Sequence, residues 1–287
     1  MPKHHTAPKV APHEDELPPF SRRLNRWFMR YVRWYLCRHF HAVRLLKNDS
    51  DPDGDRRHSP EIGNEPVFFC TNHPGWWDPL IFWSLGEYLY PDRLAYGPID
   101  ADALGKYKFF ERIGFIGIKE NTYAGAARFL RMARAANNRR DVIFWITSQG
   151  EFCDPRLRPI QIRPGVGHAV ARATDGLVIP FALEYPFWNE RTPEALAAFG
   201  PAIRINDNPH RDAKEWNRIV SQSLEATQDR LAIAAKSRDP RAFTTVLAGR
   251  VGVGGVYDLI RRWGAWRRGE AFDASHGGEK SIVRVQP

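Results

Sequence analysis

Short apolar runs and amphipathic segments alternate along the middle of the chain. Strands are predicted where apolar residues cluster between polar turns, at residues 66–70, 93–96, 114–119, 142–147 and 177–183. Helices are predicted where apolar residues recur at helical spacing, at residues 78–88, 103–112, 123–136, 165–173 and 212–236. Strands separated by helices predict an α/β fold with a largely parallel or mixed central sheet covered by helices.

The segment at residues 20–47 has helical periodicity with two chemically different sides. At about 100° per residue, one side holds Arg22, Arg23, Arg26, Arg30 and Arg33, and the other holds Leu24, Trp27, Phe28, Tyr31, Trp34 and Tyr35. Residues 256–268 repeat this arginine and tryptophan pattern. Three interpretations remain open: a helix packed on the core, a nucleic-acid-binding helix, and an interfacial helix at the level of the lipid headgroups.

Composition narrows the class of protein. The chain of 287 residues is 43% hydrophobic and 26% charged, which allows a buried core and excludes disorder as the main state. The net charge is +9, and residues 20–46 contain seven arginines and no acidic residue. No run approaches the roughly 18 apolar residues of a membrane-spanning helix, and residues 1–19 lack the apolar part of a signal peptide. We therefore expect a protein that neither spans a membrane nor is exported.

The segmentation predicts four regions and no metal or disulfide framework. Cys37, Cys70 and Cys153 have no paired spacing, which argues against disulfides and a zinc site and favours a reducing compartment. The regions are a disordered tail at 1–19, a basic amphipathic helix at 20–47, a folded body at 65–240, and a basic, aromatic helix with a loose tail at 241–287.

The loop after the first predicted strand of the body carries the clearest chemical signal. It places His73 and Asp78 five positions apart, with Asp78 predicted as the N-cap of the next helix and Pro79 in its first turn. Asp78 can accept a hydrogen bond from one imidazole nitrogen and leave the other as a base, which is the base and orienting half of a catalytic triad. The nucleophile would then be a substrate hydroxyl. The alternative is that Asp78 only caps its helix and His73 is a turn residue.

Four ordered motifs resemble those of a known family. Asn72, His73 and Asp78 follow a hydrophobic strand, and blocks at residues 114–119, 146–151 and 178–181 come after them in order. This arrangement, over residues 66–185, resembles the glycerolipid acyltransferases of the lysophosphatidic acid and lysophospholipid acyltransferase group. The resemblance implies a glycerol-3-phosphate acyltransferase-like fold and an acyltransferase domain at residues 65–240.

The resemblance also implies a mechanism without metal or cofactor. His73 would remove a proton from an acceptor hydroxyl, which attacks the thioester of acyl-CoA or acyl-carrier protein, while Asp78 orients the imidazole. The residues implied in substrate binding are Asn72, Gly75, Lys119, Gln149, Gly150, Glu151, Arg156 and Arg158. Among them, Gly75 and Gly150 would let backbone N–H groups approach the oxyanion. Arg156 and Arg158 fit either a solvated loop or an anion-binding loop.

Two departures from the family pattern concern the acceptor. Glu120 stands where the second block of the family has a phosphate-binding Arg, and a carboxylate repels phosphate. Gln149 stands where the third block has Glu, and Gln can also donate hydrogen bonds. The acceptor is expected to be a glycerolipid or lysophospholipid, with an ornithine lipid, glycolipid or carotenoid glycoside as the alternative.

The expected partners are membrane lipids, an anionic bilayer surface and an acyl thioester donor. We expect a peripheral protein on the cytoplasmic face of the membrane, with no nucleic acid bound, because the basic aromatic ends then hold the catalytic face at the bilayer. Two alternative hypotheses do not involve catalysis: a basic nucleic-acid-binding protein and a catalytically silent lipid-binding module.

Overall fold

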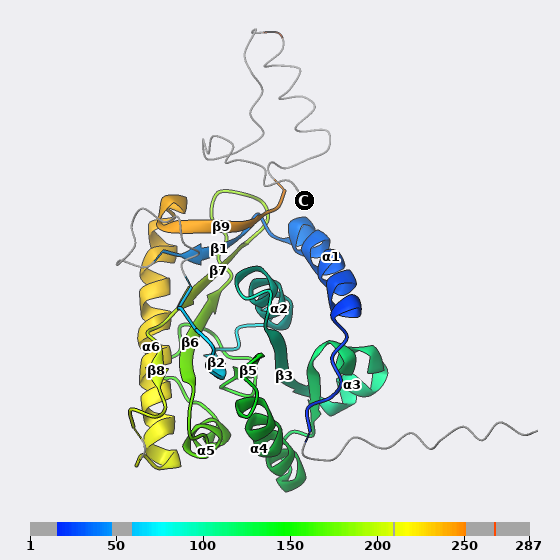
Figure 1. The fold of residues 1–287 in the computed structure, drawn as a ribbon. Coiled ribbons are helices and arrows are strands. Elements are labelled where there is room, and N and C mark those ends of the chain that lie inside the picture. The colour runs from blue at the N-terminus through cyan, green and yellow to red at the C-terminus, as the bar shows by residue number, and fades with distance from the viewer. Residues whose placement is uncertain (1–15, 48–58, 209, 251–266, 268–287) are drawn as a thin grey trace, which may run out of the picture.

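The structure, a computed structural model, describes residues 16–47, 59–208, 210–250 and 267 (Figure 1). It is an α/β fold with a nine-stranded mixed sheet, in the order β4-β3-β5-β2-β6-β7-β1-β9, with β8 paired to β6. The strands are β1 Ala42–Leu46, β2 Val67–Thr71, β3 Leu94–Asp100, β4 Phe115–Ile118, β5 Val142–Thr147, β6 Leu177–Glu184, β7 Glu194–Phe199, β8 Ile203–Arg204 and β9 Phe243–Ala248. The helices are α1 Arg22–His39, α2 Asp78–Leu89, α3 Ala101–Lys106, α4 Tyr123–Asn137, α5 Pro164–Ala171 and α6 Ala213–Ser237, with 3₁₀ turns η1 Lys108–Ile113 and η2 Pro240–Ala242. The predicted α/β class, with a mixed and mostly parallel sheet covered by helices, is confirmed.

The central strands run in one direction, and the sheet changes direction at one side. Strands β4, β3, β5, β2 and β6 are paired in parallel along the sheet. Strand β7 is antiparallel to β6, β1 is parallel to β7, and β9 is antiparallel to β1. The carboxyl ends of the five central strands therefore meet at one edge, where open α/β sheets bind their ligands.

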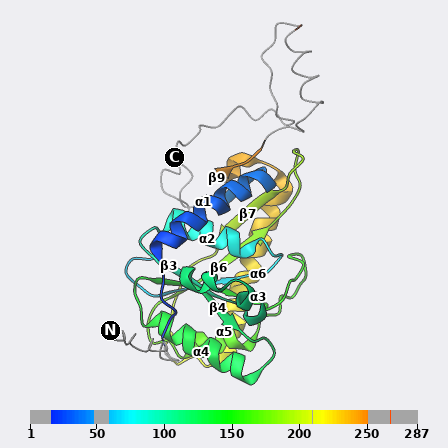
Figure 2. The ribbon, with the colours of Figure 1, turned by 90° about the vertical axis from the view of Figure 1, so that its right-hand side faces the viewer.

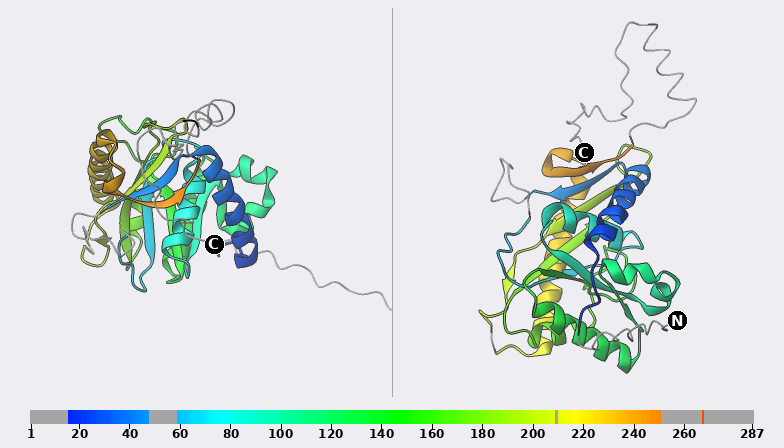
Figure 3. Two further views of the ribbon diagram at one scale, coloured as in Figure 1. Left: turned by 90° about the horizontal axis from the view of Figure 1, so that it is seen from above. Right: turned by 45° about the vertical axis from the view of Figure 1, so that its right-hand side comes forward.

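Helices cover both faces of the sheet, which explains why the central strands are apolar throughout. Figure 3 (left) shows three layers, with α6 on one side of the sheet and α1 and α2 on the other. In β5, Ile143 and Trp145 pack toward the α1 and α2 layer, and Val142, Phe144 and Ile146 pack toward the other helices. Successive side chains of a strand point to opposite faces, so a doubly covered strand has no polar side.

The N-terminal helix is shorter than predicted. Helix α1 ends at His39, and residues 42–46 form the fully buried strand β1 between β7 and β9. Phe40 has an extended backbone (φ −114°, ψ 151°), which ends the helix. The helical pattern therefore stops near Leu36, and the apolar run after His41 pairs with other strands. Arg44 is thus a buried residue of the sheet and takes no part in the cationic side of the helix.

Helix α1 also packs differently from the two-sided wheel. Its buried residues are Phe28, Met29, Val32 and Leu36, whereas Trp27, Tyr31 and Trp34 are exposed. Figure 2 shows α1 lying across α2. The aromatic side of the wheel is therefore divided, because part of it covers the core and the rest faces outward.

Further elements differ from the sequence prediction or extend it. The helix predicted at 103–112 is the short helix α3 followed by η1, because Tyr107 leaves helical geometry (φ −134°, ψ 67°). Strands β7, β8 and β9 were not predicted, and β1 and β9 extend the sheet beyond residues 65–240. Helix α6 agrees closely with the predicted helix, and Asp212 caps it.

Some predictions fall mostly outside the described residues. These are the tail at 1–19, of which residues 16–19 are described, and the helix at 256–268, of which only residue 267 is described. Pro18 lies against the body, since its carbonyl accepts a hydrogen bond from the Tyr96 hydroxyl at 2.7 Å. Over the described part of the chain, no helix combines the length and apolar character needed to cross a membrane.

Candidate active site

The loop that carries His73 lies at the carboxyl edge of the sheet, between the loops that follow β5 and β6. Thr71, the last residue of β2, pairs with Thr147 of β5 and Phe181 of β6. Two backbone hydrogen bonds join the loops: Ser148 N–H donates to the Thr71 carbonyl at 2.8 Å, and Cys153 N–H donates to the His73 carbonyl at 2.9 Å. The backbone of His73 is therefore held by regular sheet structure on one side and by the β5 loop on the other.

His73 and Asp78 form the predicted base and orienting pair. Nδ1 of His73 lies 2.5 Å from Oδ2 of Asp78, with 16% of the His73 side chain exposed and none of the Asp78 side chain. With the proton on Nδ1 shared with Asp78, Nε2 is the basic nitrogen. Within the described residues Nε2 has no hydrogen-bond partner, so it is available to a substrate.

Asp78 does not cap α2, contrary to the sequence prediction. The cap position is Trp77, which makes no side-chain capping bond, and Asp78 is the first residue of the helix. Its carboxylate turns back instead and accepts the Gly75 N–H at 3.2 Å on the same oxygen that faces His73. The tight turn at residues 74–77 thus brings the His and the Asp together.

Tyr185 is a third member of this group that the sequence analysis missed. Its hydroxyl donates to Oδ1 of Asp78 at 2.5 Å, so both carboxylate oxygens are engaged. Burial raises the pKa of Asp78, and the hydrogen bonds from His73, Tyr185 and Gly75 oppose that rise. Burial, together with the charge and hydrogen bond of Asp78, raises the pKa of Tyr185 well above its usual value, so its hydroxyl keeps its proton. The only sequence signal was a Tyr shortly after β6, which is too common to single out.

Asn72 and Gln149 are buried and support the loop. The Asn72 side chain donates to the Leu183 carbonyl at 2.9 Å and accepts the Leu183 N–H at 2.8 Å, as a neighbouring strand would. Oε1 of Gln149 accepts the His73 N–H at 2.9 Å. Both residues belong to the predicted site, and in the structure they bind backbone groups of His73 and β6.

The two glycines predicted to approach an oxyanion have engaged N–H groups. The Gly75 N–H is bound to Asp78, and the Gly150 N–H donates to the Thr147 carbonyl at 3.1 Å. Gly150 has a φ of +69°, and a Cβ there would lie 2.8 Å from the Arg163 side chain. The need for glycine at 150 is therefore explained by backbone conformation and by close packing of Arg163.

The predicted charged contacts are spread over a wider surface. Arg156 pairs with Asp154, and Arg158 pairs with Asp229 of α6 at 2.6 Å. Lys119, Glu120 and Glu151 are exposed. Strand β4 is three strands away from β2 in the sheet, about 14 Å at about 4.8 Å per strand. Lys119, which follows β4, is therefore separated from His73, which follows β2.

Arg163 connects the loop after β4 to the loop after β5. Its guanidinium donates to the Gln149 carbonyl at 3.3 Å and to Oδ1 of Asn121 at 3.0 Å. Arg163 forms no ion pair within the described residues, so its charge is available to an anion at this edge.

Neither nearby cysteine is an activated nucleophile. Burial raises the pKa of the Cys70 thiol to about 12, and burial with the charge of Glu151 raises the pKa of the Cys153 thiol. Both thiols therefore stay protonated at neutral pH. Among the described residues, no group of three or more His, Cys, Asp or Glu side chains is placed to hold a metal ion.

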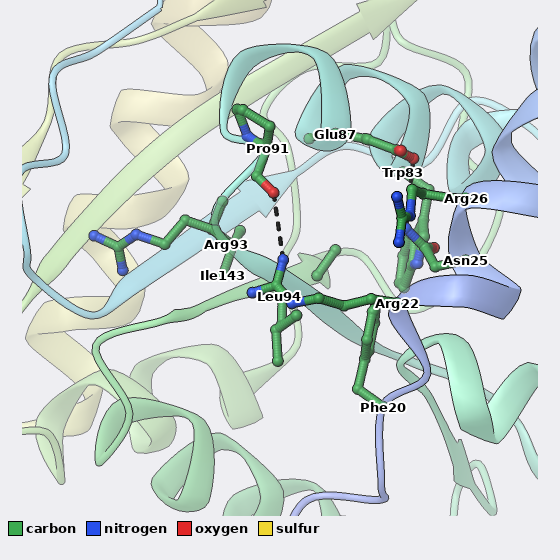
Figure 4. Close-up of a pocket in the computed structure, with 12 residues that line it drawn as sticks. Phe20, Arg22, Asn25, Arg26, Trp83, Glu87, Pro91, Arg93, Leu94 and Ile143 are labelled. Atoms are coloured by element: carbon green, nitrogen blue, oxygen red, sulfur yellow. Dashed lines mark hydrogen bonds between the residues drawn. The ribbon is translucent and has the colours of Figure 1, made fainter.

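A cavity of about 270 Å³ lies between the start of α1, the second half of α2 and the start of β3 (Figure 4). Arg22, Arg26 and Glu87 are among its lining residues, and Arg22 donates to the Pro91 carbonyl at 3.5 Å. Glu87 lies nine residues after Asp78 on α2, about 13 Å at 1.5 Å per residue. This cavity is separate from the His73 loop.

No family model matches this sequence, and no curated protein matches it significantly. The likeness to glycerolipid acyltransferases therefore rests on the four sequence motifs described above, and the chemical case rests on the geometry of this site.

Proposed function

We propose that this protein is an O-acyltransferase that moves a fatty acyl group from acyl-CoA or acyl-carrier protein to a hydroxyl of a glycerolipid or lysophospholipid. The observation that carries the proposal is the His73–Asp78 pair, with its 2.5 Å contact, its buried carboxylate and its open Nε2. The glycerol-3-phosphate acyltransferase-like character of the fold is part of the same proposal.

The chemistry follows from what the site holds. Nε2 of His73 takes the proton of the acceptor hydroxyl as its oxygen bonds to the thioester carbonyl carbon. The C–S bond then breaks, and the imidazolium returns the proton to the leaving thiolate. Asp78 stabilises the imidazolium in between, and Tyr185 holds Asp78. A thioester is already activated toward attack, so a correctly positioned general base such as His73 accounts for the reaction.

Two chemical classes of acceptor fit the charges around the site. Arg163 keeps a charge without an ion pair among the described residues, which supports an acceptor with a phosphate. Arg156 and Arg158 are already neutralised by carboxylates, and Glu120 is exposed. This second set favours a neutral or zwitterionic acceptor, such as an ornithine lipid, a glycolipid or a carotenoid glycoside.

The test is an acyl-transfer assay with a panel of acceptors and a long-chain acyl-CoA. Thiol release is followed with a chromogenic disulfide, and the products are identified by mass spectrometry. We expect an acylated lipid to form with wild-type protein and not with His73→Ala. Thiol release that continues in His73→Ala, or no acylated product from any acceptor, would contradict the proposal.

A further inference from the structure

Six exposed aromatic side chains gather around one side of the molecule, and we call them the aromatic face. They are Trp27, Tyr31 and Trp34 of α1, Trp76 of the catalytic loop, and Tyr107 and Phe109 at η1. Trp27 is 64% exposed, Trp34 57% and Trp76 54%. Large exposed aromatic side chains are costly in water unless another surface covers them.

Ring contacts make the aromatic face continuous from α1 to the catalytic loop. Tyr31 stacks on Tyr35 with ring centroids 5.8 Å apart, and Tyr35 lies 6.4 Å from Trp76. Trp76 in turn stacks on Trp77 at 4.0 Å. Trp76 is three residues from His73, so the aromatic face reaches the candidate active site.

A second series of contacts joins α1 to η1. The buried Phe28 lies 6.3 Å from Tyr31 and 5.9 Å from Phe109. The aromatic face therefore involves three segments that are distant in sequence. Beside the candidate active site, a further exposed aromatic ring, that of Phe152, lies with its centroid 4.6 Å from that of the His73 ring.

Positive charge borders the aromatic face. Arg23, Arg30 and Arg38 are exposed and lie within about 60° of Trp27 around the helix, at 100° per residue. The guanidinium of Arg38 lies over the Trp34 ring, 5.9 Å from its centroid. Residues 20–46 contain no acidic side chain, so nothing on this segment repels an anionic surface.

We infer that the aromatic face docks on an anionic lipid bilayer, with α1 lying flat and His73 opening at the bilayer surface. Trp and Tyr rings favour the headgroup region, and exposed arginines beside them attract anionic lipids. The buried stripe Phe28, Met29, Val32 and Leu36 binds α1 to the body, so only its outer side enters the headgroups. The orientation of His73 rests on the proposed function, because a site facing the bilayer takes its acceptor from the leaflet.

The docking step can be tested without turnover. Binding of the His73→Ala protein to vesicles is measured by co-sedimentation, with phosphatidylcholine alone and with phosphatidylcholine mixed with phosphatidylglycerol. We expect the protein to bind the anionic vesicles. The double variant Trp27→Ala/Trp34→Ala should lower the affinity about tenfold, and Trp76→Ala should also lower it. The matched control is Ile233→Ala, which removes a side chain that is 70% exposed on α6, on the opposite side of the sheet.

Two outcomes would overturn the docking. One is equal vesicle binding by Trp27→Ala/Trp34→Ala and Ile233→Ala, with both variants folded by circular dichroism. The other is no binding to anionic vesicles together with aromatic-dependent self-association in light scattering, which would assign the face to a protein partner. Vesicle binding that passes this test while the acyl-transfer assay fails would leave the docking intact and refute the proposed function alone.

Discussion

Among the residues that the structure describes, two His–carboxylate pairs lie at the ends of sheet strands, and they differ in how well they suit proton transfer. His73 and Asp78 lie on the loop after β2, 2.5 Å apart. His41 and Glu194 lie at the starts of β1 and β7, with Nε2 of His41 3.7 Å from the Glu194 carboxylate. The residue types are alike, and the surroundings differ.

The two pairs differ in whether an Arg also binds the carboxylate and in how accessible the imidazole ring is. Arg44 donates to the other oxygen of Glu194 at 3.0 Å and to the Thr245 hydroxyl at 2.8 Å, with Arg44 3% and Glu194 2% exposed. Nδ1 of His41 lies 3.2 Å from the Arg250 carbonyl, so both its nitrogens have neighbours. At His73 one imidazole nitrogen is open. Besides the imidazole, Asp78 accepts hydrogen bonds from two uncharged donors, the Gly75 N–H and the Tyr185 hydroxyl. A His–carboxylate pair can act as a base when no Arg neutralises the carboxylate and when the second imidazole nitrogen is accessible to a substrate.

The largest effect is expected from removing the two histidines separately. His73→Ala should lower acyl transfer about 10³- to 10⁴-fold, because the proposed general base is lost. His41→Ala should keep the turnover of folded protein, because His41 is remote from the β2 loop in the sheet order. Initial rates of thiol release normalised to folded protein measure both. Equal losses in the two variants would abolish the distinction between the pairs.

The next effect separates activity from stability at the His73–Asp78 pair. Asp78→Asn should lower acyl transfer about a hundred- to a thousandfold, because the imidazolium loses its carboxylate. Burial raises the pKa of Asp78, so the folded state holds this proton more tightly than the unfolded chain does. Ionised Asp78 therefore reduces stability as the pH rises through that raised pKa. We expect Asp78→Asn to retain its melting temperature at pH 7, measured by calorimetry, and a large drop would contradict this account.

The structural pair should respond in the opposite way. Glu194→Gln leaves buried Arg44 without its carboxylate, which should cost about 3–5 kcal/mol of unfolding free energy. Urea unfolding at pH 7 gives this quantity, and Glu151→Gln serves as an exposed control. A Glu194→Gln protein as stable as the control would show that the pair does not support the β1–β7 edge.

The smallest effect concerns Tyr185. Tyr185→Phe removes the donor to Oδ1 of Asp78, so the pKa of Asp78 should rise further and activity should be lost at a higher pH on acidification. At neutral pH we expect about a tenfold fall in kcat. The full pH–rate profile is the measurement, since a merely structural role would lower the rate without moving the acidic limb.

The parts of the fold with local signals were predictable. The apolar strands at β2, β5 and β6 and the capped helix α6 were found because each has a continuous pattern of its own. Strand β1 was missed because its apolar run directly follows a helix, and only pairing with β7 and β9 marks it as a strand. Pairing partners distant in the chain leave no local pattern.

At the candidate site, His73 and Asp78 could be found because they are close in sequence and chemically distinctive. Tyr185 could not, because it is 107 residues away from Asp78 and meets it only through the pairing of β2 with β6. Arg156 and Arg158 were predicted either to bind an anion or to lie in a solvated loop. In the structure Asp154 and Asp229 pair with them, so their charges are already compensated.

By itself the sequence determined the α/β class, the order of the central elements and the His–Asp pair, because these depend on periodicity and short separations. Only the tertiary structure decided which side of α1 faces outward and which histidine keeps an open nitrogen. The reason is physical: exposure and charge compensation depend on neighbours contributed by other elements, and those neighbours are chosen by sheet pairing and packing.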